Sequence, residues 1–291
     1  MNNPDVSVVM PVFNAERYVA EAIRSVLDQT YENLELVIID DKSTDASLSI
    51  AKQFETDPRV RIVANDANHG ECYSRNRGVL ASRGKVIAFA DADDICHPDK
   101  LKMQMERLRV SGQYVDLVVF TDYYKMDSEG VKIWTGLRSY PYELLQQDAP
   151  AALIMDPGVV LCATIVCLKS SALAVGLYDE SLRRFGDYDF ALRLAKGRKF
   201  VGIDVPLYGY RINQTSIVQS TPARTRYALT LKIAERYLKR HPELLNGIHA
   251  PEIRRQLARY LIRSRDYRLA LYHTIRDPRI VWDLFHCTSR S

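Results

Sequence analysis

Three aspartates stand within four positions at the end of an apolar segment: Asp91, Asp93 and Asp94, in AFADADDICHPDK. Like charges this close repel, so solvent screens them, some are protonated, or a bound cation neutralises them. If the extended backbone continues past the apolar run, Asp91 and Asp93 face the same side and offer hard oxygen ligands suited to Mg²⁺ or Mn²⁺. A solvated acidic turn that caps the next helix fits the same spacing. The spacing alone leaves both interpretations open.

Two further polar clusters follow apolar segments earlier in the chain. PVFN, with Pro11, Phe13 and Asn14, comes after the first segment, and Asp40-Asp41 comes after the second. In an open parallel sheet, ligands bind outside the carboxyl ends of the strands. If the three segments are neighbouring strands, their polar clusters converge on one edge, which favours a ligand site over three unrelated caps.

The elements needed to position these clusters are indicated by the hydrophobic pattern. Strands are expected at residues 6–12, 34–40, 59–65, 85–91 and 115–126, and helices at 15–30, 43–54 (capped by Ser43 or Thr44), 73–82 and 99–112. Strands that alternate with helices of this length predict an α/β fold with a doubly wound, mostly parallel sheet.

The second half of the chain is less regular. We expect a loop or flap over residues 127–157, a strand at 163–169 that could be mixed into the sheet, and a helix at 186–197 that ends at Gly197. From about Pro222 the pattern is helical, with two short helices meeting near Ser264.

The composition of the 291 residues, 47% hydrophobic and 26% charged, is that of a folded protein. The apolar runs are far below the roughly 18 residues of a membrane-spanning helix, and the first residues do not resemble a signal peptide. We expect a cytoplasmic protein, which could also lie at the inner face of the membrane. Five cysteines without metal-binding spacing predict reduced, structural thiols.

The charge is unevenly distributed. Residues 221–291 contain 15 lysines and arginines against 6 acids, although the whole chain carries only +4. These arginines alternate with aromatic residues, so the segment could lie on anionic lipid, or it could be a helical cap with a solvated basic face. Nothing in it matches a nucleic-acid recognition motif, so no nucleic-acid partner is expected.

Several ordered motifs together resemble the family 2 glycosyltransferases of the GT-A fold. They are SVVMPVFN through DDKSTD, then NHGECYSRNRG through ADADD, then GLYDESLRRFGDYDFALRLA and YRINQTSI, and they cover about residues 5–220. The resemblance implies a catalytic domain at 1–220, with a donor half at about 1–125 and an acceptor half at 126–220. A basic helical extension at 221–291 lies outside it.

The resemblance also implies roles for individual residues on the donor side. Pro11, Phe13 and Asn14 would line the nucleotide pocket, and Asp41 would accept a hydrogen bond from the base, most naturally the N3–H of uracil. Arg75 would lie near the nucleotide, although a surface helix charge is the plain alternative.

Asp91, Ala92 and Asp93 look like the DxD motif of the family. Asp93 would bind Mn²⁺ or Mg²⁺ directly, and Asp91 would reach the ribose or a metal-bound water. Asp94 would support these two residues or cap the helix that follows. Many relatives have a histidine where this chain has Asn213, a weaker ligand.

Asp187 is the candidate catalytic base, because an inverting transfer needs a carboxylate to take the proton from the acceptor hydroxyl. It could equally be the N-cap of its helix. Relatives often have a glutamate where this chain has Gly186, which removes a carboxylate that could contact the acceptor.

The expected reaction is therefore transfer of a hexosyl or N-acetylhexosaminyl group from a nucleotide-diphosphate sugar, most simply a UDP-sugar, to a hydroxyl of a glycan or lipid-linked acceptor. A nucleotidyltransferase is the first alternative, but PVFNAERY after the first strand is not the glycine-rich, basic loop that would hold a triphosphate. The absence of a GxGxxG or GxxxxGK[ST] loop there also disfavours a dinucleotide-binding enzyme and a P-loop phosphotransferase. A non-catalytic nucleotide-sugar-binding protein is the second.

Overall fold

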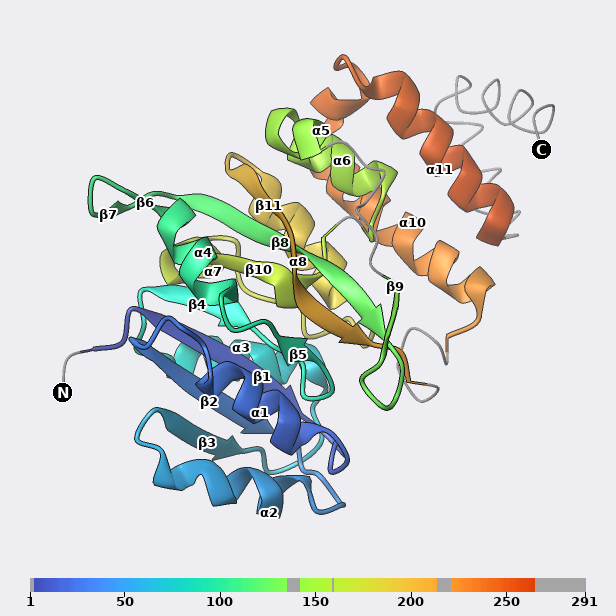
Figure 1. Ribbon diagram of the computed structural model, residues 1–291. Coiled ribbons are helices and arrows are strands. Elements are labelled where there is room, and N and C mark those ends of the chain that lie inside the picture. The colour runs from blue at the N-terminus through green and yellow to red at the C-terminus, as the bar shows by residue number, and fades with distance from the viewer. Residues whose placement is uncertain (1–2, 135–141, 159, 214–220, 265–291) are drawn as a thin grey trace.

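A computed structural model of the chain describes residues 3–134, 142–158, 160–213 and 221–264. Its centre is a nine-stranded sheet with the order β3-β2-β1-β4-β10-β8-β11-β5, to which β9 adds beside β8 (Figure 1). The strands are β1 (Val6–Val12), β2 (Leu34–Asp40), β3 (Val60–Ala64), β4 (Val86–Phe89), β5 (Ile95–Cys96), β8 (Leu117–Met126), β9 (Lys132–Trp134), β10 (Ile165–Leu168) and β11 (Lys199–Arg211), with a separate hairpin of β6 (Arg109–Val110) and β7 (Gln113–Tyr114).

The sheet is mostly parallel, as the sequence pattern predicts. β1 pairs in parallel with β2 and β4, β2 with β3, and β8 with β11. β10 runs antiparallel to both β4 and β8, which confirms the expected mixed strand. The five consecutive strands predicted from the sequence are all present.

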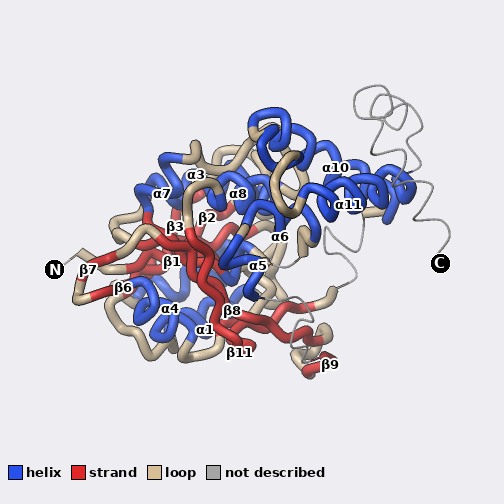
Figure 2. The backbone as a smooth tube through the Cα atoms, turned by 90° about the horizontal axis from the view of Figure 1, so that it is seen from above, coloured by secondary structure: helices blue, strands red, loops and turns tan. Residues whose placement is uncertain are grey.

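Helices cover both faces of the sheet (Figure 2). They are α1 (Val19–Leu27), α2 (Ser47–Lys52), α3 (Glu71–Ala81), α4 (Lys100–Leu108), α5 (Tyr142–Gln147), α6 (Ala149–Met155), α7 (Lys169–Ala174), α8 (Gly186–Ala195), α10 (Ala223–Arg240) and α11 (Ala250–Ser264). Alternate residues of a strand face opposite sides. Val86 and Ala88 of β4 thus join the core under α1 and α4, whereas Ile87 and Phe89 join the core under α3 and α8.

Two expectations about single elements are wrong. The helix expected from Ser43 or Thr44 begins later, and Ala46 is its N-cap. Residues 142–155, expected within a loop, form α5 and α6, and the Asp148 side chain caps α6 by accepting a hydrogen bond from Ala151 N at 3.0 Å. Residues 132–134 of the expected flap form β9, and residues 135–141 lie outside the described residues.

The sequence pattern also missed β11, a strand of 13 residues. Pro206 lacks the N–H that a central strand donates, and such a residue argues against a strand. The structure accommodates it with shifts in the β8–β11 register on both sides of Pro206, as a β-bulge does.

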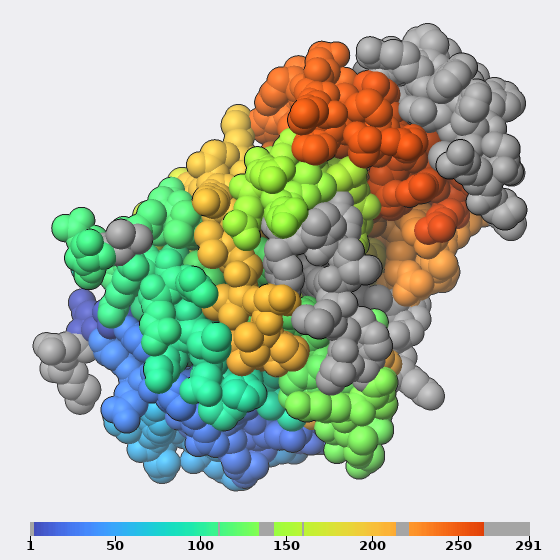
Figure 3. All heavy atoms as spheres, turned by 45° about the horizontal axis from the view of Figure 1, so that its top comes forward, coloured from blue at the N-terminus to red at the C-terminus, as the bar shows by residue number. Residues whose placement is uncertain are grey.

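The C-terminal helices pack on the sheet domain. The apolar faces of α10 and α11 supply Leu231, Ile253 and Leu257 to the same hydrophobic cluster that contains Phe89 of β4 and Phe190 of α8. These helices form the end of the molecule opposite β2 and β3 (Figures 1 and 3). Residues 265–291, and the helix expected there, lie outside the described part.

Within the described ranges, no helix combines the length and the apolar character needed to cross a membrane. Cys72, Cys96, Cys162 and Cys167 are free and buried, in agreement with the predicted reduced thiols, and Cys287 lies outside the described residues.

Candidate active site

The polar clusters that follow β1, β2 and β4 meet at the carboxyl edge of the sheet, because these three strands are parallel neighbours. The loops after β1 and β2 are joined by hydrogen bonds. Asn14, whose φ of 49° places it in the left-handed region, accepts from Thr44 N at 2.8 Å, and its own N–H donates to Ser43 Oγ at 3.2 Å. Pro11 is part of β1, and Phe13 beyond it is exposed, so an apolar ring faces solvent beside this edge.

Asp41 is buried at the centre of the neighbouring loops. Its Oδ1 accepts from Asn65 Nδ2 at 2.6 Å and from His69 N at 3.0 Å, and its Oδ2 accepts from Gly70 N at 2.7 Å. Gly70 has a φ of 94°, a conformation that favours glycine and turns its N–H toward the carboxylate. A carboxylate oxygen can accept two hydrogen bonds, so Oδ2 retains one position for a further donor.

Asp40 does not cap α2. Its Oδ2 accepts a hydrogen bond from Ser43 N at 3.2 Å, so its side chain orients the loop between β2 and α2 and does not cap α2.

The segment Asp91 to Asp94 is a turn, closed by a hydrogen bond from Asp94 N to Asp91 O at 3.3 Å. β4 already ends at Phe89, so the extended geometry that would place Asp91 and Asp93 on the same side does not persist, and that prediction is wrong. Ala92 has its side chain buried in the core, which leaves its backbone as the part that a donor could meet.

Arg75 supplies the positive charge that the sequence around Asp91 lacks. Its Nη2 lies 2.6 Å from Asp91 Oδ1, and its side chain is only 3% exposed. The guanidinium also lies 5.4 Å from the ring centre of Tyr178 and 5.8 Å from that of Phe89, distances of cation–π contacts. The alternative that Arg75 is a surface helix charge is wrong.

Asp93 and Asp94 differ from Asp91 in that neither forms an ion pair with Arg75; each accepts a hydrogen bond from a residue in or just after β11 instead. Burial, together with the charge of Asp91, raises the pKa of Asp93 to about 6, and Asp93 Oδ2 accepts from Asn213 Nδ2 at 3.3 Å. Burial raises the pKa of Asp94 well above its usual range, and its Oδ1 accepts from Arg211 N at 2.7 Å. Asp94 therefore anchors the turn to β11, and Asp99 rather than Asp94 is the N-cap of α4.

Arg211 is a site residue that sequence reasoning missed, although it lies in the motif that contains Asn213. Its Nε donates to Asp93 O at 2.7 Å, and its Nη2 lies 2.7 Å from Glu21 Oε2. The side chain is 2% exposed, so it fixes the acidic turn from the side of β11. Asn65 was missed too, although its place after β3, at the same edge, could have indicated it.

The donor set at the turn fits a divalent cation that shares its ligands with phosphate. Within the described residues, no three His, Cys, Asp or Glu side chains form a closed metal-binding group. Asp93 and Asp91 offer carboxylate oxygens, and the raised pKa of Asp93 shows that its negative charge is poorly compensated. One or two carboxylates that rely on substrate phosphates for the remaining ligands are typical of Mg²⁺.

Asp187 lies in the first turn of α8, one residue inside the helix, so the N-cap alternative is wrong: Phe185 is the N-cap, in a left-handed conformation with φ 59°. Burial raises the pKa of Asp187, the charge of Arg75 opposes this, and the charge of Asp91 adds to it. Asp187 thus lies within electrostatic range of the Arg75–Asp91 pair.

The start of α8 packs closely against the start of α3. A Cβ atom on Gly186 would lie 2.2 Å from Cys72 Sγ, so no side chain fits at position 186 without movement of Cys72. Glu71, which the sequence interpretation did not include, lines the same small pocket as Arg75 and Asp187.

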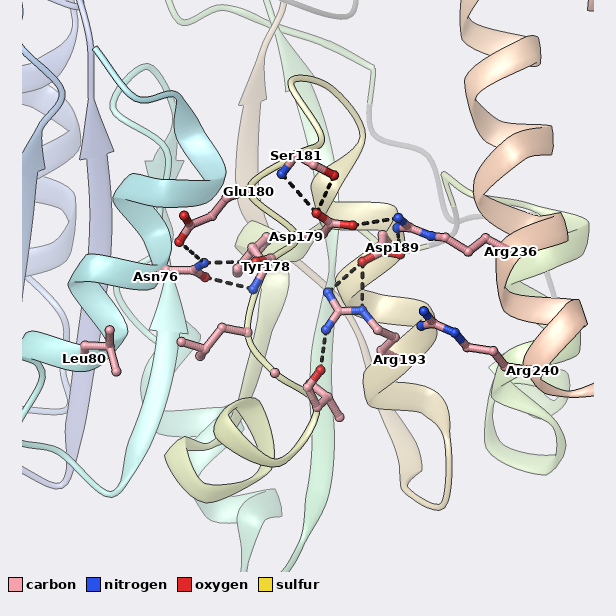
Figure 4. A pocket seen from close by; sticks show the side chains of 13 residues that line it. Asn76, Leu80, Tyr178, Asp179, Glu180, Ser181, Asp189, Arg193, Arg236 and Arg240 are labelled. Carbon is pink, nitrogen blue, oxygen red and sulfur yellow. Dashed lines mark hydrogen bonds and ion pairs between the residues drawn. The ribbon is translucent and has the colours of Figure 1, made fainter. Parts of the chain in front are cut away.

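A larger pocket of about 600 Å³ lies behind this site, between α3, α8 and α10 (Figure 4). Arg236 of α10 bridges Asp179 at 2.6 Å and Asp189, while Arg193 pairs with Asp189 at 2.6 Å across one turn of α8. Arg240 extends from α10 into the same pocket.

The mostly parallel sheet with helices on both faces is that of the GT-A fold. More particularly, the chain belongs to glycosyl transferase family 2, whose family model matches residues 7–162. This family assignment confirms the resemblance, and with it the expectation of an enzyme that transfers sugars.

Relatives in Bacillus subtilis match about three quarters of the chain. It is 32% identical over 220 residues to the putative glycosyltransferase EpsE of Bacillus subtilis, a match that spans 74% of this chain and 75% of that protein. It is 29% identical to the putative teichuronic acid biosynthesis glycosyltransferase TuaG of the same organism, over 74% of this chain and 81% of TuaG.

Solved structures share the fold at lower identity. S. aureus TarS 1–349 in complex with UDP-GlcNAc superposes with a TM-score of 0.64 at 18% identity, over 89% of this chain and 72% of that one. The mannosyltransferase PcManGT of Pyrobaculum calidifontis, in complex with GDP-Man and Mn²⁺, gives 0.63 at 17% identity, over 97% and 84%.

Proposed function

We propose that the protein transfers a sugar from a nucleotide-diphosphate donor, a UDP-sugar in the first place, to a hydroxyl of a glycan or lipid-linked acceptor by a single, inverting displacement. The observation that carries this proposal is that Arg75 of α3 pairs with Asp91 of the turn after β4 and lines one small pocket with Asp187 of α8. Family membership makes transfer of a sugar, rather than of a nucleotidyl group, the reaction of this site.

Donor binding is assigned to the edge formed by the loops after β1, β2 and β4. The free position on Asp41 Oδ2 suits an imide N–H such as N3–H of uracil, and Phe13 offers an exposed ring beside it. Guanine also presents an N–H to a carboxylate, and GDP-Man is bound by PcManGT, so GDP is the competitor against which UDP must be measured.

Asp93, with help from Asp91, would hold Mn²⁺ or Mg²⁺. A cation there neutralises the charge of the diphosphate leaving group when it is bound. Arg75 remains fixed to Asp91 and keeps a positive charge at the edge of the phosphate site. Asp187 takes the proton of the acceptor hydroxyl, and its raised pKa makes it a stronger base than an exposed aspartate.

The donor assignment is tested by equilibrium binding of UDP and GDP to the full-length protein with Mn²⁺, followed by hydrolysis assays with a panel of UDP- and GDP-sugars. We expect UDP to bind more tightly and one UDP-sugar to be hydrolysed slowly without acceptor. Tighter binding of GDP would overturn the choice of base. Absence of binding and of hydrolysis for every donor would argue for a non-catalytic protein.

We also propose that residues 1–220 are the catalytic domain, with donor and acceptor halves meeting near residue 125, and that the basic extension at 221–291 contacts an anionic membrane surface. Arg255, Arg259 and Arg263 of α11 are exposed and spaced four residues apart, so they share one helix face. Such a face suits anionic lipid. Five aromatic residues were expected to assist. Tyr260 is buried and donates a hydrogen bond to Ile154 O at 3.1 Å, so it does not face lipid, and Tyr267, Tyr272, Trp282 and Phe285 lie outside the described residues.

A further inference from the structure

Glu71 is an acidic residue at the active site to which the proposed reaction gives no task. It is the first residue of α3, and its side chain is 43% exposed. Its Oε1 lies 2.6 Å from Arg75 Nη2, the same nitrogen that contacts Asp91. Among the described residues, Arg75 is its ion-pair partner, and Oε2 makes no hydrogen bond.

The pocket beside Glu71 contains two carboxylates, those of Glu71 and Asp187. They come from the first turns of α3 and α8, which are held together where Gly186 meets Cys72. The absence of a side chain at Gly186 leaves Glu71 as the second carboxylate beside the candidate base. A hydroxyl group held beside Asp187 at this pocket therefore also lies beside Glu71.

The charges around Glu71 define what it can bind. The charge of Arg75 lowers the pKa of Glu71, and the charges of Asp91, Asp187 and Asp93 raise it. Arg75 already occupies the side between Glu71 and Asp91. Arg183 and Arg184 also line the pocket, so its charge is mixed, but a carboxylate oxygen only accepts hydrogen bonds and Oε2 therefore needs a donor. A neutral O–H donor adds no charge and supplies the hydrogen bond that Oε2 lacks.

We propose that Glu71 is a specificity-determining residue whose Oε2 accepts a hydrogen bond from a sugar hydroxyl, while its Oε1 keeps Arg75 turned toward Asp91. The inference rests on the proposed function, since it assumes a sugar in the pocket. That hydroxyl can belong to the donor sugar or to the acceptor, and the two sources are separated by experiment.

The test compares the full-length wild type with Glu71→Gln, which keeps the length and shape of the side chain but not its charge. Both are assayed with Mn²⁺ on the hydrolysed donor identified from the panel and on its deoxy analogues, each lacking one hydroxyl. Glu252→Gln is the matched control, because Glu252 has a similar exposure of 42%, pairs with Arg255 at 2.7 Å, and lies outside the pocket.

We expect Glu71→Gln to lower kcat/KM about 10- to 100-fold on the parent sugar, as loss of a hydrogen bond to a charged group does. One deoxy analogue should be used equally well by both proteins. If this occurs in donor hydrolysis, the hydroxyl belongs to the donor. If hydrolysis is unchanged and the loss appears only in transfer to acceptor analogues, the hydroxyl belongs to the acceptor.

Two results would overturn the inference while leaving the proposed function intact. One is an unchanged kcat/KM in Glu71→Gln. The other is an equal loss on the parent sugar and every deoxy analogue, which would indicate that Glu71 acts only by holding Arg75. Absence of turnover by the wild type with any donor would instead contradict the proposed function, and this inference with it.

Discussion

Arg75 Nη2 lies 2.6 Å from Asp91 Oδ1, although 16 residues separate the two in sequence. The same nitrogen is 2.6 Å from Glu71 Oε1, so one buried guanidinium joins two carboxylates from opposite sides. Packing of the guanidinium against Tyr178 and Phe89 holds it in this position. The ion pair makes the acidic turn compatible with a buried environment before any metal is bound.

Replacing Arg75 with lysine should weaken both folding and donor binding. Lysine keeps the charge but not the planar guanidinium that packs against Tyr178 and Phe89. We expect a loss of about 1–3 kcal/mol in the free energy of unfolding, measured with urea, and at least tenfold weaker binding of the UDP complex. Arg59→Lys, in an ion pair with Asp57 away from the site, is the control. Equal effects of the two substitutions would contradict the role of Arg75.

Asp187→Asn should separate chemistry from binding. We expect the rate of transfer to fall about 10²- to 10⁴-fold, the usual contribution of a general base, with donor binding nearly unchanged. Stability at neutral pH should not fall, because burial raises the pKa of Asp187 and thus disfavours its charged form in the folded state. Single-turnover transfer and thermal unfolding measure the two effects. Normal transfer would remove Asp187 from the role of base.

Metal binding should depend on pH through Asp93. Its pKa of about 6 lies above its ordinary value of 3.8, so below pH 6 the folded protein holds a proton that a cation must displace. We expect the affinity for Mn²⁺ in the presence of UDP to be constant above about pH 7. Below pH 6 the affinity should fall, with a slope that approaches a factor of ten per pH unit, and binding of the ion should release a proton. Titration calorimetry in two buffers checks this. The Asp93→Asn variant should bind Mn²⁺ without releasing this proton. If the variant binds Mn²⁺ as tightly as the wild type, Asp93 is not a ligand.

The bridge from Arg236 to Asp179 and Asp189 should stabilise the contact between α10 and α8. We expect Arg236→Gln to lower the free energy of unfolding by about 1–2 kcal/mol, because Asp189 is buried and loses one of its two arginine partners. Arg240→Gln is a close control, since Arg240 lines the same pocket and has no ion pair among the described residues; we expect less than about 0.5 kcal/mol there. Urea unfolding of both variants measures these free energies, and equal values would contradict a stabilising role of the Arg236 bridge.

The exposed arginines of α11 should contribute to binding of anionic vesicles. Because α11 buries Ile253 and Leu257 in the common core, removing the helix would disturb the fold, so charge reversal is the better experiment. We expect the double variant Arg255→Glu, Arg259→Glu to sediment less with phosphatidylglycerol vesicles than the wild type, and the difference to vanish at high salt. Equal sedimentation of both proteins would favour the helical cap.

The sequence determined the elements that have a strong period and the polar residues at their ends. β1, β2 and β4 could be predicted because each is a short, predominantly apolar run, and Asp41 and Asp91 could be placed at one edge because parallel strands end together. β11 could not be predicted, because Pro206 is acceptable in a strand only where the partner allows a bulge, and the partner is not visible in the local pattern.

Tertiary structure alone decided how the charges of the site are balanced. The stretch around Asp91 contains no nearby cation, yet folding brings Arg75 from α3 and Arg211 from β11 to the acidic turn. It also places Glu71 and Asp187 in one pocket through the contact of Cys72 with Gly186. The physical reason is that charge pairing and burial act over a few ångströms in space, whereas these residues are up to about 120 positions apart along the chain.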